Sequence, residues 1–224
     1  MHTEPVDWPL AIDTPLGPLV VTLTCGTEQA GVPDEESTLE SGALVAKWRD
    51  VAGVMVDLLS TPYDGARAVP KGWAVPECWG MEWRFHAPGS WTPPMALSAL
   101  LPQGTGATYD ADEDMIMAEA WTDDWRLGVG GADEVWFARQ VKHASLAPSW
   151  GRVFSEAGPP GAGGLGPWQT ERGVTWYLPA LEKGESATLW VASAWCRAGA
   201  ANADDVPNYA VEVSPAFLRE AARV

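Results

Sequence analysis

The stretch that decides the fold is residues 173–195, GVTWYLPALEKGESATLWVASAW. Val174, Trp176 and Leu178 alternate with residues of mixed polarity, which is the period-2 pattern of a strand with one buried face. A turn that contains Pro and Gly follows, and residues 186–195 then continue as a long, mostly apolar segment. This stretch therefore predicts two strands joined by a turn.

Similar alternation predicts further short strands on either side of this stretch. They cover residues 18–25, 81–87, 115–121, 125–129, 134–141 and 207–213. Because these strands do not alternate regularly with helices, a doubly wound parallel sheet is disfavoured. We expect a mainly β (α+β) chain, folded as an antiparallel β-sandwich or partly open barrel.

Two helices complete the expected fold. Apolar residues recur at spacings of three and four from Leu44 to Leu59, so residues 39–59 are predicted to form an amphipathic helix packed on the sheet. Ser214-Pro215 is a typical helix start and predicts a short C-terminal helix over 215–222. The apolar segment 95–101 is interpreted as one or two helical turns.

Residues 157–168, AGPPGAGGLGPW, are either a linker or a long surface loop. We expect one domain over 1–224; the alternative is an α+β part, 1–156, joined to a β part, 169–224. The glycines of 161–166 match the dinucleotide fingerprint letter by letter. However, prolines flank them where a strand and a helix are required, so a loop is favoured.

The charge of the chain excludes some partners. Fourteen Lys and Arg stand against thirty Asp and Glu, giving a net charge of −16. Such a body is repelled by phosphate, which argues against nucleic acid and anionic membranes as partners. The first ten residues lack the basic and apolar segments of a secretory signal. The chain has three cysteines, an odd number that does not favour a set of disulfides. We therefore expect reduced thiols and a cytoplasmic location.

The acids are concentrated between Asp110 and Glu134, on and between predicted strands. Carboxylates at a strand edge attract basic partners, although acidic loops also serve solubility alone. The candidate residues for binding a basic protein are Asp110, Asp112, Glu113, Asp114, Glu119, Trp121, Asp123, Asp124 and Trp125.

A calcium site is a weaker alternative for the start of this segment. Asp110, Asp112 and Asp114 lie at alternate positions, as hard oxygen ligands do in calcium loops. The rest of the EF-hand pattern fails, since Met115 and Trp121 occupy the glycine and bidentate positions. We therefore expect no cofactor, with calcium as the alternative.

The fourteen tryptophans divide into two sets. A core set on strand-like or apolar patterns comprises Trp48, Trp83, Trp176 and Trp190, and a loop set among Pro and Gly comprises Trp73, Trp79, Trp91, Trp150 and Trp168. Exposed Trp rings form sugar platforms and interfaces. An alternative ligand-binding set therefore combines loop tryptophans with one polar strand face, and consists of Trp73, Trp79, Trp91, Glu82, Arg84 and His86.

No nucleophile elbow, P-loop or zinc-protease motif is present in the sequence, so we expect a non-enzymatic protein. The first hypothesis is an acidic binding protein, such as an inhibitor or immunity-type protein, that engages a basic protein partner. The second is a carbohydrate-binding β-sandwich that uses loop tryptophans. A structural component of a phage or secretion particle is the third.

Overall fold

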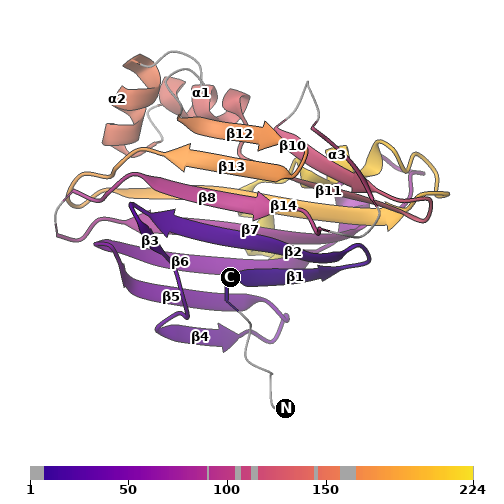
Figure 1. Ribbon diagram of the computed structural model, residues 1–224, viewed down its shortest axis with the longest axis horizontal. Coiled ribbons are helices and arrows are strands. Elements are labelled where there is room, and N and C mark those ends of the chain that lie inside the picture. The colour runs from indigo at the N-terminus through magenta and orange to yellow at the C-terminus, as the bar shows by residue number, and fades with distance from the viewer. Residues whose placement is uncertain are drawn as a thin grey trace.

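The computed structural model describes residues 8–89, 91–103, 107–111, 116–143, 146–156 and 165–223, and they form two antiparallel sheets (Figure 1). The order of strands in sheet A is β1 (Leu10–Thr14), β2 (Gly17–Cys25), β8 (Met95–Leu100), β13 (Gly173–Leu178) and β12 (Gly166–Thr170), with β3 (Glu28–Gln29) beside β2. The order in sheet B is β4 (Glu35–Thr38), β5 (Leu44–Val51), β6 (Val54–Tyr63), β7 (Glu77–His86), β14 (Ser186–Arg197), β11 (Trp125–Gly131), β10 (Met117–Trp121) and β9 (Thr108–Ala111). The mainly β, antiparallel sandwich is confirmed.

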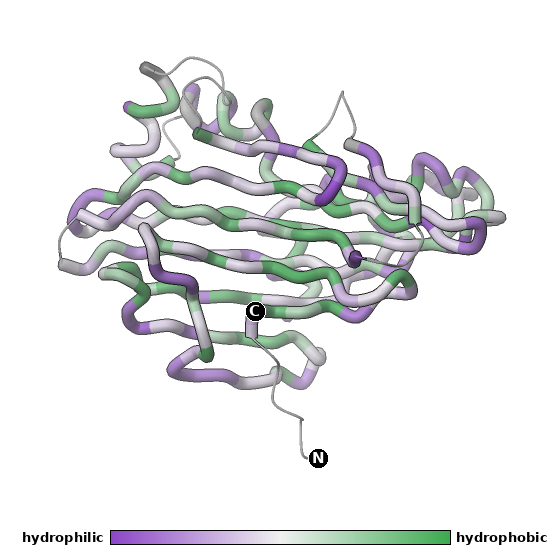
Figure 2. Tube along the Cα trace, viewed as in Figure 1, coloured by the Kyte–Doolittle hydropathy of each residue, from purple (hydrophilic) through white to green (hydrophobic). Residues whose placement is uncertain are grey.

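The core lies between the facing sides of the two sheets. Along β2, Leu19, Val21 and Leu23 are buried and alternate with half-buried residues. Hydrophobic residues are found along the strands of both sheets (Figure 2), and the central strand β14 of sheet B is buried on both of its faces. The predicted core tryptophans are all at most 6% exposed: Trp48, Trp83, Trp176 and Trp190.

The helix predicted over residues 39–59 is wrong, because this segment forms the hairpin of β5 and β6. Both turn residues, Ala52 and Gly53, have positive φ angles of 51° and 85°, as a tight two-residue hairpin turn requires. Leu44, Ala46 and Trp48 of β5 and Val54, Val56 and Leu58 of β6 are buried at alternate positions, and a bulge between Trp48 and Val51 interrupts this alternation. The combined apolar spacing imitates one helical stripe.

Two predicted strands are helices. Residues 134–141 lie in α1 (Glu134–Lys142), where the Asp133 carboxylate accepts a hydrogen bond from the Trp136 backbone N–H at 2.6 Å. Residues 207–213 lie largely in α3 (Val206–Val211), in which Val206 and Ala210, one turn apart, are buried. In such short segments the apolar residues fit either period, so periodicity alone does not distinguish a strand from a helix.

The other predicted strands and the C-terminal helix are present, and one segment predicted as helical turns is a strand. Residues 95–101 form strand β8 and not helical turns, because alternate residues from Met95 to Ala99 are buried. The strands expected at 18–25, 81–87, 115–121 and 125–129 are confirmed as β2, β7, β10 and β11, with β10 and β11 paired as a hairpin. The C-terminal helix is α4 (Pro215–Ala222), capped by Ser214, whose hydroxyl accepts the Phe217 N–H at 3.2 Å.

Helices α3 and α4 cover the outer side of sheet B. Glycines make these close approaches possible: a Cβ on Gly80 would lie 2.2 Å from Leu218, and one on Gly128 would lie 2.7 Å from Pro207. Helices α1 and α2 (Pro148–Glu156) lie beside the end of β12 (Figure 1), and a 3-10 helix spans Gly65–Arg67. None of the helices in the described part of the chain is long and apolar enough to cross a membrane.

Strands from before and after residues 157–168 are interleaved in both sheets. β13 pairs with β8, and β14 lies between β7 and β11. Of the segment 157–168 itself, residues 157–164 lie outside the described residues, and they include most of the glycine run.

Glu185 fixes the start of α2 to the turn before β14. Its carboxylate accepts hydrogen bonds from the backbone N–H groups of Ser149, at 2.9 Å, and Glu182, at 2.8 Å. Partial burial alone would raise the pKa of Glu185, but the hydrogen bonds from Ser149 and Glu182 and the nearby Arg152 outweigh it, so the pKa lies below its ordinary value of 4.5.

Replacing Glu185 by Gln is therefore expected to destabilise the protein at pH 7 by about 1 kcal/mol. Because the folded carboxyl has the lower pKa, its contribution is complete above the unfolded value near 4.5 and disappears as the pH falls through the folded value. Thermal melts of both proteins between pH 3 and 7 measure this, with the exposed Glu171→Gln as control. A difference between E185Q and the parent that is independent of pH would contradict the assignment.

Candidate functional site

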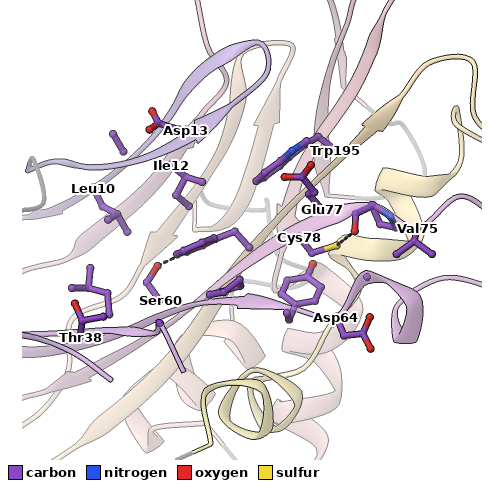
Figure 3. A pocket seen from close by; sticks show the side chains of 18 residues that line it. Leu10, Ile12, Asp13, Thr38, Ser60, Asp64, Val75, Glu77, Cys78 and Trp195 are labelled. Carbon is purple, nitrogen blue, oxygen red and sulfur yellow. Dashed lines mark hydrogen bonds between the residues drawn. The ribbon is translucent and has the colours of Figure 1, made fainter. Parts of the chain in front are cut away.

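A cleft lies between β1, the edge strand of sheet A, and the strands of sheet B that face it (Figure 3). Its volume is about 740 Å³, within the range of small-ligand pockets. Leu10 and Ile12 of β1 line one side of the cleft, and Trp79 of β7 and Trp195 of β14 line another. The wall on both sides is therefore largely apolar.

Two tryptophans form the aromatic part of the cleft. Trp195 lies opposite Glu77 across the β14–β7 ladder, and Trp79 lies opposite Ser193, so both rings project from the inner face of sheet B. The indole N–H of Trp79 donates to the Ser60 hydroxyl at 2.6 Å, which fixes the orientation of that ring. The Trp79 ring is thus held in place before any ligand binds.

All charged residues among those that line the cleft are carboxylates: Asp13, Asp64 and Glu77. The Asp64 carboxylate caps the 3-10 helix, because it accepts a hydrogen bond from the Ala66 N–H at 3.0 Å. Asp13 lies on the other side of β1 from Ile12, at the rim (Figure 3). Glu77 is exposed beside the Trp195 ring and has no hydrogen-bond partner among the described residues, so it is the acid available to a ligand.

The thiol in the cleft wall is not a nucleophile. Burial raises the pKa of Cys78 to about 12, and its Sγ lies 3.8 Å from the Pro76 carbonyl oxygen. Burial also raises the pKa of Cys25 to about 12 and that of Cys196 above its ordinary value. These thiols stay protonated near neutral pH, and thiolate chemistry needs the opposite shift.

The predicted acidic segment is divided between two places. Asp110 and Glu119 are neighbours across the β9–β10 ladder, and Asp123 and Asp124 are exposed at the turn between β10 and β11. Asp112, Glu113 and Asp114 lie outside the described residues.

The two tryptophans of that segment project from opposite sides of sheet B. Trp121 lies opposite Arg126, and the guanidinium of Arg126 donates to Asp204 at 2.7 Å. Trp125 is covered by the Arg197 guanidinium, 4.0 Å from the ring centroid. Asp110, Asp123 and Asp124 are exposed and Glu119 is half-buried, and the two rings do not form one platform with these acids.

The alternative calcium site consists of Asp110, Asp112 and Asp114, and the structure describes only Asp110 among them. Within the described part of the chain no group of His, Cys, Asp and Glu side chains has the proximity that a metal ion needs. Asp112 and Asp114, the two other candidate ligands, lie outside the described residues.

The alternative ligand-binding set is not brought together. Trp79 lines the cleft, Trp73 packs edge-on against Tyr209 with ring centroids 4.9 Å apart, and Trp91 is 65% exposed in a loop. The polar strand face exists, but it lies on the outer side of sheet B. There Glu82 is buried and paired with Arg84 at 2.7 Å, and His86 Nδ1 lies 2.8 Å from the Ser186 hydroxyl.

Sequence reasoning missed Glu77, Trp195 and Ser60 as site residues. Ser60 and Glu77 come from the consecutive strands β6 and β7, whereas Trp195 comes from β14, and only the strand order brings it beside them. The available signal was Trp195 itself, an aromatic residue near the end of a long, mostly apolar strand.

Comparisons with known proteins do not assign this chain to a family. No family model and no curated protein matches this chain. Among solved structures, a polysaccharide lyase is similar over 87% of this chain, with 14% sequence identity and a TM-score of 0.37. The match spans 27% of the lyase chain, about a quarter of its length. A likeness at this level assigns no activity.

Proposed function

We propose that this chain is a binding protein whose cleft receives a basic side chain of a protein partner. The observation that carries this proposal is that the charged residues of the cleft are all carboxylates, set beside two tryptophan rings. The aliphatic stem of Lys or Arg packs on an indole ring while its charge reaches a carboxylate and the ring face. Glu77 and Trp195 offer this combination in one place.

The rest of the molecule favours the approach of such a partner. The net charge of −16 attracts a basic surface over long range and accelerates its association. Leu127 of β11 lies opposite Trp195 of β14. The acidic turn, which includes Asp124, ends directly before β11 and is three residues from Leu127. The acidic turn therefore lies toward the end of sheet B where Trp195 meets the cleft. An inhibitor or immunity-type protein that engages a cationic partner is the class we propose.

A matched pair of small probes tests the cleft. Nα-acetyl-lysine amide and Nα-acetyl-norleucine amide have the same aliphatic stem and differ in the terminal ammonium. We expect the lysine probe to quench or shift tryptophan fluorescence at lower concentration, with affinity that falls as salt is raised. Glu77→Gln is expected to weaken its binding about tenfold, because a charge-assisted contact is lost.

Glu171→Gln, an exposed acid in the turn between β12 and β13, is the control and should bind as the parent does. Equal affinity for the lysine and norleucine probes, or unchanged lysine binding by E77Q, would contradict the proposal.

A further inference from the structure

The outward face of sheet A carries no charge on four of its strands. The outward residues of β2, β8, β13 and β12 alternate with the buried core residues and are, in strand order, Pro18, Val20, Thr22, Thr24, Ala96, Ser98, Leu100, Gly173, Thr175, Tyr177, Gly166, Trp168 and Thr170. They are neutral in a chain with a net charge of −16. This absence of charge needs a physical reason, since charged side chains are the usual means of keeping a sheet face in water.

The outward face of sheet B shows the usual arrangement. Glu35, Lys47, Asp57 and Arg84 are paired in register across β4, β5, β6 and β7, so their charges alternate in sign. Helices α3 and α4 cover other parts of that face. By contrast, no described helix lies in front of sheet A (Figure 1). The neutral face is therefore both uncharged and uncovered by any described helix.

The neutral face combines hydroxyl groups with two exposed aromatic rings. Thr22, Ser98 and Thr175 are paired in register across three strands, and the Ser98 and Thr175 hydroxyls lie 2.9 Å apart. Trp168, opposite Thr175, is 55% exposed, and Tyr177, two residues along β13, is 42% exposed. The two rings are thus diagonal neighbours on adjacent strands.

These rings are free to meet a ligand. Gly166 lies opposite Tyr177 and leaves the space beside its ring open. Among the described residues neither the Trp168 indole N–H nor the Tyr177 hydroxyl has a hydrogen-bond partner. Exposed aromatic rings with unused donors, next to a row of hydroxyls, match the chemistry of a sugar chain, which presents C–H faces and hydroxyl groups.

We propose that this face binds a neutral polysaccharide with a flat, extended backbone, of the β-1,4-linked class. Such a chain has no charge, so it meets no repulsion from the acidic body and needs no counter-charge on the face. A basic protein partner would find no carboxylate among these outward residues. A second copy of this chain would bring another net charge of −16 against the first. This site shares no residue with the cleft and stands independently of the function proposed for it.

Binding is tested with microcrystalline cellulose and with chitin, both insoluble β-1,4-linked polymers. We expect saturable depletion of the protein from solution by at least one of them, with little change between low and high salt. Trp168→Ala and Tyr177→Ala are each expected to weaken binding about tenfold. Trp91→Ala, which removes an exposed ring from a loop outside this face, is the matched control and should bind as the parent does.

Each other result overturns the proposal. Absence of binding to both polymers, or unchanged binding by the W168A and Y177A variants, removes the site. If light scattering shows a dimer that Trp168→Ala converts to monomer while neither polymer binds, the face is a contact between copies. Glu77→Gln is expected to leave polymer binding unchanged, so failure of this site and failure of the cleft proposal are distinguishable.

Discussion

Replacement of Trp176 by alanine is expected to lower the free energy of unfolding by about 3–5 kcal/mol. The Trp176 side chain is fully buried between the sheets, and its indole N–H donates to the Ala132 carbonyl oxygen at 2.7 Å. The ring also packs against Gly131, where an added Cβ would lie 2.9 Å from it. Alanine would therefore leave a large cavity and an unpaired carbonyl at the point where β13 meets the end of β11.

Urea unfolding followed by circular dichroism measures this loss. Trp176→Phe keeps most of the apolar volume but removes the donor, so its loss should be clearly smaller than that of W176A. Trp168→Ala, on the exposed face of the same sheet, is the control and should cost less than about 1 kcal/mol. Similar losses for W176A and W168A would show that Trp176 does not hold the core together.

A second large effect is expected from the arginines that neutralise Glu82. The Glu82 side chain is completely buried on the outer side of sheet B. Arg84 Nε lies 2.7 Å from one carboxylate oxygen, and Arg219 Nε from α4 lies 3.4 Å from the other. Replacing both arginines by methionine leaves a buried, uncompensated charge, which we expect to cost about 3–5 kcal/mol.

This loss of stability comes from the buried carboxylate of Glu82 that is left without a counter-charge, and not from the loss of the ion pairs themselves. Adding Glu82→Leu to the Arg84→Met, Arg219→Met protein should therefore restore most of the stability, as measured by the same urea titration. The exposed pair of Arg67 and Glu220 is the control, and Arg67→Met should cost less than about 1 kcal/mol. Failure of the third substitution to recover stability would contradict this account.

The fold class could be predicted from sequence because several strands bury alternate residues without interruption. Val174 to Leu178 and Leu19 to Cys25 show this pattern and were identified correctly. The β5–β6 hairpin was mistaken for a helix since Ala52-Gly53 interrupts the alternation without a Pro or Asn signal. β4 has four exposed residues, so it carries no apolar pattern at all.

Of the residues that line the cleft, the sequence predicted Trp79 alone, in the alternative ligand-binding set. The main candidates, between Asp110 and Trp125, do not line it, and its carboxylates and second tryptophan were not predicted. Their identity was not predictable, because Glu77 and Trp195 meet through the pairing of β7 with β14. That pairing depends on which distant strand fills the centre of sheet B, and no local sequence pattern encodes it.

The central position of β14 also bears on how the chain is made. β14 is the last strand in the sequence, yet it separates β7 from β11 within sheet B. During synthesis from the N-terminus, the hairpins β5–β6 and β10–β11 can form early, but β7 and β11 each present an open edge until residues 186–197 emerge. Open strand edges pair readily with other chains. Premature termination or cleavage before Ser186 would thus convert an acidic protein into two aggregation-prone half-sheets, and a slow, non-local closing step should govern the folding rate.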